Sequence, residues 1–130
     1  MKNPLIVFAV GIYLVSCGDN SIDIDALYID VHELTSSCDC IEARIAVTDV
    51  FIAQQKDVRD RAKNMGYQTR KERASAHQIN RDLHELIQNK YAEINEKCIG
   101  DLAPENADED CEAVILLDQK RKEAYDAVNY

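Results

Sequence analysis

Apolar residues recur at three- and four-residue steps through much of the chain, and this spacing is typical of amphipathic α-helices. The clearest segment runs from Gln78 to Cys98. Thr69 and Glu72 precede it at the spacing of a capping box, so the helix is predicted to begin beside Thr69. The apolar stripe of this segment consists of Ile79, Leu83, Leu86, Ile87, Tyr91, Ile94 and Cys98.

Two further segments carry the same pattern. Asp39 to Met65 contains no glycine or proline and is predicted to form a helix of about seven turns. The other segment runs from near Asp108 to Val128. Because the connections near Gly66 and Pro104 are short, the three helices should pack up, down, up as a small antiparallel all-α bundle. The stripes are Ile41, Ile45, Thr48, Phe51, Ile52, Val58, Ala62 and Met65 in the first, and Val114, Leu117, Arg121, Ala124, Tyr125 and Val128 in the last.

Residues 22–34 carry an ambiguous pattern. Ile22 to Asp25 alternate like a strand, whereas the longer series from Ile24 to Leu34 steps like a helix. We predict a short N-terminal helix, because Ser21 is a suitable cap and no partner strand is visible. The stripe of this helix would also place Tyr28 at the core or its boundary, as expected for Tyr91 and Tyr125.

The N-terminus has the three parts of a secretory signal. Lys2 is followed by an eleven-residue apolar run, Leu5 to Val15, which is too short to span a bilayer. Leu14-Val15-Ser16-Cys17 resembles the lipobox of bacterial lipoproteins, which is aliphatic, aliphatic or small, small, then cysteine. The resemblance implies a signal peptide over residues 1–16, removed before Cys17, and a lipid anchor on the Cys17 sulfur. The alternative is an ordinary signal peptide, or a single signal anchor, in which Cys17 is incidental.

This resemblance predicts a cell-envelope location, with the soluble part outside the cytoplasm. Residues 17–21 would be a lipidated cysteine and short tether, and residues 22–130 one helical domain. The tether spans about 15 Å when extended, so the domain should lie close to the membrane. Gly18 rather than aspartate follows Cys17, which in lipoproteins resembling those of enteric bacteria favours the outer membrane.

Four cysteines remain beyond Cys17, and an even number outside the cytoplasm predicts two disulfides. Cys38 and Cys40 lie where the first helix starts, Cys98 where the second ends and Cys111 where the third starts. An up, down, up bundle brings these points to one end, so each cysteine of the C-x-C pair should bond to Cys98 or Cys111, with the pairing left open. The spacing does not match a zinc site. The alternative is a thiol-disulfide exchange protein using Cys38 and Cys40.

Charge is unevenly distributed. Removing residues 1–16 takes away one of 15 basic residues and none of the 24 acidic ones, which leaves a formal charge of −10 and argues against nucleic-acid binding. Residues 98–112 carry only acidic charge, whereas the turn between the first two helices is basic. A solvated turn is the simpler interpretation, and contact with an anionic surface is the functional one. The candidate contact residues are Arg59, Arg61, Lys63, Arg70, Lys71 and Arg73.

The sequence offers no catalytic constellation and implies no metal or cofactor. An EF-hand starting at Asn106 is excluded, since Cys111 and Leu117 occupy the positions of the required glycine and glutamate. His77 and His84 are two helical turns apart, too far to share a metal ion. We therefore predict a lipid-anchored, non-enzymatic helical module that binds an envelope protein, associates with itself or has a structural role.

Overall fold

The computed structural model describes residues 22–63, 66 and 69–129. About 82% of these residues are helical and none forms a strand, which confirms the all-α prediction. The signal, Cys17 and the tether lie outside the described residues, as does the predicted helix end at Met65. The long helices are α2 (Ser37–Lys63), α3 (Arg70–Lys97) and α4 (Ala113–Val128). The short 3-10 helices are η1 (Ile24–Leu27), η2 (Val31–Glu33), η4 (Gly100–Leu102) and η5 (Pro104–Asn106).

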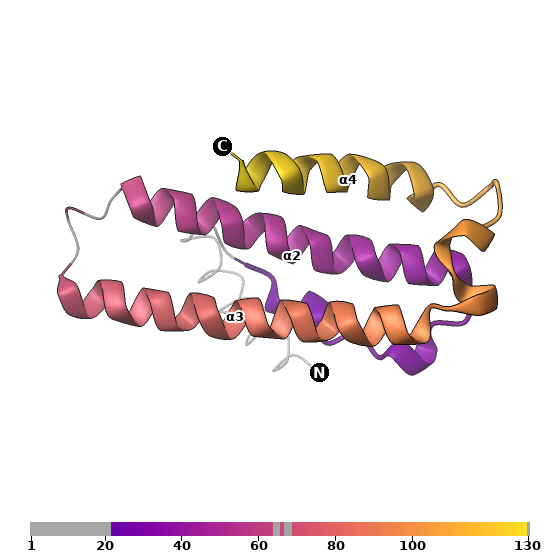
Figure 1. The fold of residues 1–130 in the computed structure, drawn as a ribbon, viewed down its shortest axis with the longest axis horizontal. Helices are drawn as coiled ribbons and strands as arrows, with labels where there is room; N and C mark the ends of the chain where they lie inside the picture. The colour runs from indigo at the N-terminus through magenta and orange to yellow at the C-terminus, as the bar shows by residue number, and fades with distance from the viewer. Residues whose placement is uncertain (1–21, 64–65, 67–68, 130) are drawn as a thin grey trace, which may run out of the picture.

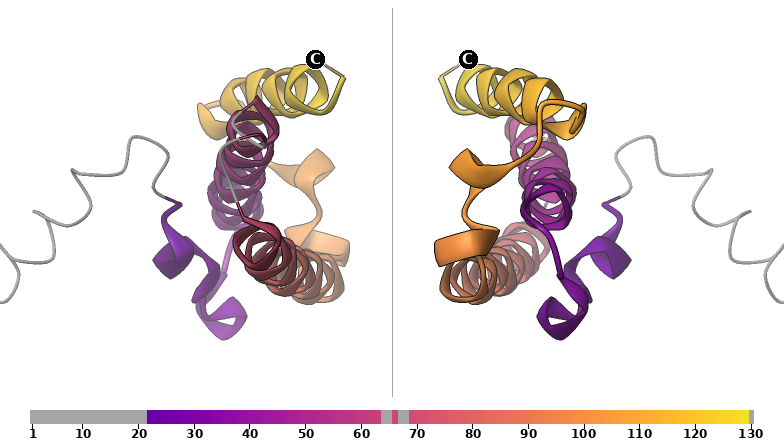
Figure 2. Two further views of the ribbon diagram at one scale, coloured as in Figure 1. Left: turned by 90° about the vertical axis from the view of Figure 1, so that its left-hand side faces the viewer. Right: turned by 90° about the vertical axis from the view of Figure 1, so that its right-hand side faces the viewer.

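The three long helices lie side by side with α2 in the middle (Figure 1). The chain runs up α2, down α3 and up α4, as predicted. However, α4 does not pack beside α3, its predecessor in the chain, but on the opposite flank of α2, to which it runs parallel. Residues 98–112 carry the chain across one face of this layer, and residues 22–36 cover the other face (Figure 2).

Side-chain caps fix where the first two helices begin. At α3, the Thr69 hydroxyl accepts from the Glu72 amide at 3.1 Å and the Glu72 carboxylate accepts from the Thr69 amide at 3.0 Å, which confirms the capping box. In the first turn of α2, the Asp39 carboxylate accepts hydrogen bonds from the amide and the hydroxyl of Thr35, which precedes the helix. These bonds favour the charged form and hold the pKa of Asp39 below its ordinary value.

Two groups of buried residues lie on the two flanks of α2. The larger group joins α2 to α3 and to the N-terminal segment, and the smaller joins α2 to α4. Two predicted core residues of α3, Ile79 and Leu86, are instead 62% and 45% exposed, since α3 is covered by α2 only along one side. Tyr125 and Tyr28 are also exposed, whereas Tyr91 is half-buried as expected. The larger core contains Leu27, Leu34, Cys40, Ala43, Val47, Val50, Leu83, Ile87, Ile94 and Cys98, and the smaller Ile41, Ile45, Cys111 and Leu117.

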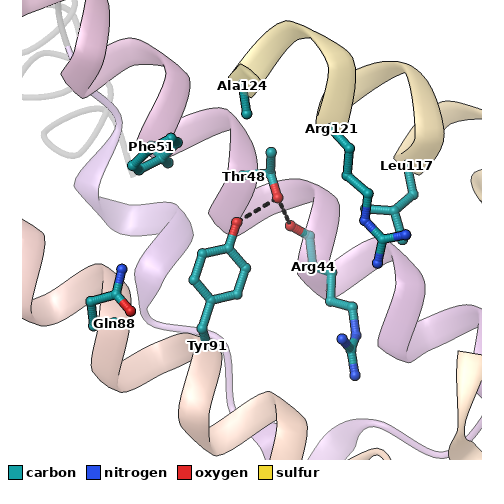
Figure 3. A pocket seen from close by; sticks show the side chains of 8 residues that line it. All are labelled: Arg44, Thr48, Phe51, Gln88, Tyr91, Leu117, Arg121 and Ala124. Carbon is teal, nitrogen blue, oxygen red and sulfur yellow. Dashed lines mark hydrogen bonds between the residues drawn. The ribbon is translucent and has the colours of Figure 1, made fainter. Parts of the chain in front are cut away.

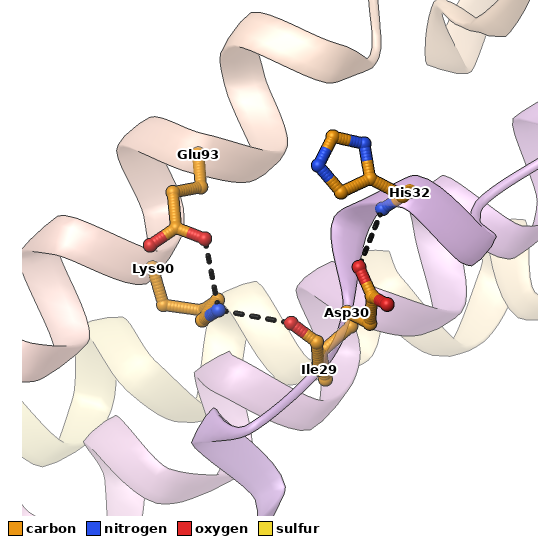
Figure 4. Close-up of polar contacts among 5 residues, drawn as sticks. All are labelled: Ile29, Asp30, His32, Lys90 and Glu93. Carbon is orange, nitrogen blue, oxygen red and sulfur yellow. Dashed lines mark hydrogen bonds and ion pairs between the residues drawn. The ribbon is translucent and has the colours of Figure 1, made fainter.

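The N-terminal segment corrects one prediction. Residues 22–34 form two separate 3-10 turns, η1 and η2, rather than one continuous helix. The Asp30 side chain accepts from the His32 amide at 3.0 Å and starts the second turn, a local bond that competes with helix continuation. Figure 4 shows how Lys90 of α3 holds this segment: its ammonium group donates to the Ile29 carbonyl and to the Glu93 carboxylate, both at 2.9 Å.

The connection between α3 and α4 is longer than expected, because α4 begins at Ala113 rather than near Asp108. The acidic residues just before Ala113 form turns instead of a first helical turn. Gly100, with φ of 60°, takes the left-handed conformation that reverses the chain after α3. The buried Ser37 hydroxyl donates to the Asp101 carbonyl at 2.8 Å and fastens the connection to the start of α2.

Candidate functional site

The four cysteines meet at one end of the layer and form the bridges Cys38–Cys111 and Cys40–Cys98. Each cysteine of the C-x-C pair bonds to a distant cysteine, as predicted. Residues two apart on a helix point about 200° away from each other, so Cys38 faces α4 while Cys40 faces the end of α3. The pair therefore clamps both neighbours of α2, and Cys40 and Cys98 are buried in the larger core. Bridges that join separate segments and lie in the core are typical of structural disulfides.

The predicted basic residues also lie together, at the opposite end of the layer where α2 ends and α3 begins (Figure 1). Several of them make intramolecular contacts. Arg61 pairs with Asp57 at 2.8 Å, and Arg59 donates to the Ala127 carbonyl at 3.2 Å, which ties the end of α4 to α2. Arg73 and Lys63 also have interaction partners within the protein. Their contact with an anionic surface stays a prediction.

A groove of about 350 Å³ opens on the face of the layer crossed by residues 98–112, and all three long helices line it (Figure 3). On α2, Arg44 points about 200° away from Glu42 and Ala46, which face the N-terminal segment. The groove and that segment therefore occupy opposite faces. The lining residues are Arg44, Thr48 and Phe51 of α2, Gln88 and Tyr91 of α3, and Leu117, Arg121 and Ala124 of α4.

A chain of hydrogen bonds crosses the floor of the groove from α3 to α2. The Thr48 hydroxyl lies 2.7 Å from the Arg44 carbonyl and 2.6 Å from the Tyr91 hydroxyl. A carbonyl can only accept, so Thr48 donates to Arg44 and Tyr91 donates to Thr48 (Figure 3). Burial raises the pKa of Tyr91 above its ordinary value, so it stays a neutral phenol. Both hydroxyl protons are thus used inside the protein.

The two arginines of the groove, unlike the two hydroxyl groups, keep hydrogen-bond donors that no group of the described residues uses. The Nε atom of Arg44 is buried and has no hydrogen-bond partner. Burial and the nearby Arg121 both lower the pKa of Arg44, with the larger effect from burial. Within the part of the chain that the structure describes, neither guanidinium group forms an ion pair or a side-chain hydrogen bond. Two cationic groups with unused donors therefore converge on one partly apolar groove.

The sequence pointed to some of these residues in another role. The helical spacing predicts both Tyr91 and Arg121 on the buried stripes of their helices. Tyr91 lies at the edge of the larger core, whereas Arg121 is exposed and lines the groove. Arg44 was not singled out. A signal for it exists, because Arg44 stands at helical spacing from Ile41 and Thr48 and so interrupts an apolar stripe with a charge.

The described residues contain no group of three or more histidine, cysteine, aspartate or glutamate side chains arranged to hold a metal ion. None of the helices formed by residues 22–63 and 69–129 is both long and apolar enough to cross a membrane. The chain matches no protein-family model, no curated protein and no solved structure.

Proposed function

We propose that this chain is a lipid-anchored protein of the bacterial cell envelope and that its helical domain is a binding module whose site is the three-helix groove. The observation that carries the proposal is the convergence of the Arg44 and Arg121 guanidinium groups on one groove, because neither forms an ion pair or a side-chain hydrogen bond within the described residues. A ligand in the groove would supply acceptors for these guanidinium groups. The groove volume of about 350 Å³ lies within the range of small-molecule sites.

The position of the groove supports this proposal. The described chain starts at Ile22, which packs against the larger core on the face opposite the groove. A short tether from Cys17 would then hold the N-terminal face toward the membrane and leave the groove open to the surrounding solution. The two disulfides fit a compartment outside the cytoplasm.

One measurement tests the anchor. The intact mass of protein extracted from membranes, alkylated without prior reduction, reports the cleavage site, the attached lipid and any free thiol. A chain that begins at Cys17, carries lipid and takes up no alkyl group is the expected result. An unmodified Cys17 would remove the anchor from the proposal.

A second measurement tests the groove. We expect the small-molecule fraction of the producing cell's envelope to shift nuclear magnetic resonance signals of groove residues in the purified protein. Ala124→Trp, which places an indole in the groove, should abolish these shifts. Ala92→Trp is the matched control, because Ala92 is exposed on α3 and does not line the groove. Shifts that are absent, or that survive in Ala124→Trp, would contradict the groove as a binding site.

A further inference from the structure

The polar groups of the groove select the charge of its ligand. Both hydroxyl protons, those of Thr48 and Tyr91, are engaged within the protein. The donors left for a ligand are the charged guanidinium groups of Arg44 and Arg121 and the neutral amide of Gln88. Guanidinium groups donate and never accept, and they bind carboxylates through paired, charge-assisted hydrogen bonds. An anionic acceptor is therefore the group that this pair of arginines lacks.

The surroundings limit how much negative charge the ligand can carry. Glu105 of η5 lies close enough to Arg44 to raise its pKa, although the two form no ion pair. The mature chain would also be strongly acidic, with a formal charge of −10 after loss of the signal. Because the Glu105 carboxylate offsets one of the two arginine charges, the net charge of these three groups is +1, which matches a singly charged ligand better than a doubly charged phosphate.

Most of the other lining residues offer apolar surface, with the Gln88 amide and the Thr48 hydroxyl as polar exceptions. Phe51 and Ala124 line the groove on the side toward the basic end of the layer, with Gln88 of α3 on the same side, and the Tyr91 ring stands across from Thr48 (Figure 3). Arg44 and Phe51 are seven residues apart on α2, which separates them by about 10 Å along the helix. The groove therefore has a cationic end and an apolar end at a spacing that suits one small amphiphilic molecule.

From these features we infer that the ligand is a small organic monocarboxylate with an apolar body, its carboxylate held by Arg44 and Arg121 and its apolar part lying against Phe51 and Tyr91. This inference rests on the proposed function of the groove and specifies its ligand class.

The test uses hydrocinnamate as the probe, titrated calorimetrically into the protein purified from producing cells in its processed form. Hydrocinnamyl alcohol keeps the apolar body without the charge, and acetate keeps the charge without the body. We expect hydrocinnamate to bind at least about tenfold more tightly than either, because the alcohol loses a charge-assisted hydrogen bond and acetate loses the burial of the apolar body. The Arg44 Nε–Hε resonance should shift on binding.

The affinity of single-residue variants for hydrocinnamate shows which arginines contact its carboxylate. Arg121→Gln should weaken hydrocinnamate binding by about tenfold or more. The matched control is Lys122→Gln, which removes the same charge from the next residue of α4, outside the groove, and should change the affinity by less than about twofold. Arg44→Lys keeps the charge but loses Nε and should also weaken binding.

Four results would overturn the inference: equal affinity for the alcohol, tighter binding of inorganic phosphate, equal effects of Arg121→Gln and Lys122→Gln, or no binding of any probe at millimolar concentration. If no probe binds while the envelope fraction still shifts the groove signals, the ligand class is wrong and the proposed binding function stands. If the envelope fraction also shifts no groove signals, both the ligand class and the proposed binding function are wrong.

Discussion

Removing one disulfide while keeping the other tests how the two bridges share the stabilisation of this fold. The two covalent loops are nested, because the separation of 58 between Cys40 and Cys98 lies inside the separation of 73 between Cys38 and Cys111. With Cys40–Cys98 intact, the shortest path from Cys38 to Cys111 runs through that bridge. This path follows the chain over two residues from Cys38 to Cys40 and over thirteen residues from Cys98 to Cys111, about fifteen in all.

The chain-entropy relation gives about 3 kcal/mol for closing a loop of about fifteen residues and about 4 kcal/mol for a loop of either full separation. Cys38→Ala/Cys111→Ala should therefore lower the free energy of unfolding by about 3 kcal/mol. Removing both bridges should cost about 7 kcal/mol, more than twice the single loss and comparable with the whole stability of a small domain. Cys40→Ala/Cys98→Ala should cost more than the other pair, because these two cysteines are 0% and 3% exposed and also fill the core.

The assay is guanidinium-induced unfolding of the purified protein, followed by far-ultraviolet circular dichroism, for the wild type, the two double variants and the quadruple variant. A loss below about 1 kcal/mol for Cys38→Ala/Cys111→Ala would refute the nested-loop reasoning. So would a quadruple variant that is no less stable than this pair.

Three further predictions concern packing, hydrogen bonding and pH. Ile87→Ala should cost about 2–5 kcal/mol in chemical denaturation, whereas Ile79→Ala on the exposed side of the same helix should change stability by less than about 0.5 kcal/mol; equal losses would contradict the described core. Tyr91→Phe should cost about 1 kcal/mol, because it removes the hydrogen bond to the α2 hydroxyl, and an unchanged unfolding midpoint would contradict that bond. Asp39 has a lowered pKa through its bonds to Thr35, so its contribution to stability is present above the ordinary pKa of 3.8 and is lost as the pH falls through the lower folded value. Asp39→Asn should flatten this part of the acid denaturation curve, and an unchanged curve would contradict the assignment.

The helices and the disulfides could be predicted because separate features of the sequence agreed. Apolar periodicity located the long helices, and the capping box marked the start of α3. The order of the helices then brought four cysteines to one end. The partner of each cysteine could not be predicted, because the choice depends on which flank of α2 each neighbouring helix occupies. Periodicity identifies a buried face but not the element that covers it.

The predictions failed where the sequence carries two signals of similar strength. Residues 22–34 have helical spacing, but Asp30 caps a new turn within the segment. The acidic residues before α4 would favour a helix N-terminus, yet Cys111 is held by its bridge to α2 just before the helix starts. Ile79 and Leu86 follow the apolar stripe of α3 beyond the width that α2 covers. A local side-chain hydrogen bond decided the first case, and tertiary contacts decided the other two.

The groove shows what the disulfide pairing adds to the sequence. Cys38–Cys111 joins the first turn of α2 to the residue two positions before α4. Because the two helices run in parallel with the same rise per residue, an offset close to the 73 at the bridge continues along both. When 73 is added to the residue number of each groove residue of α2, the result is the number of a groove residue of α4. The pairs are Arg44 with Leu117, Thr48 with Arg121, and Phe51 with Ala124. The bridge thus sets the register that places Arg121 beside Thr48 and one turn from Arg44. Once Cys38 is known to pair with Cys111 and α4 to run parallel to α2, the two arginines that interrupt separate apolar stripes are expected to share one groove.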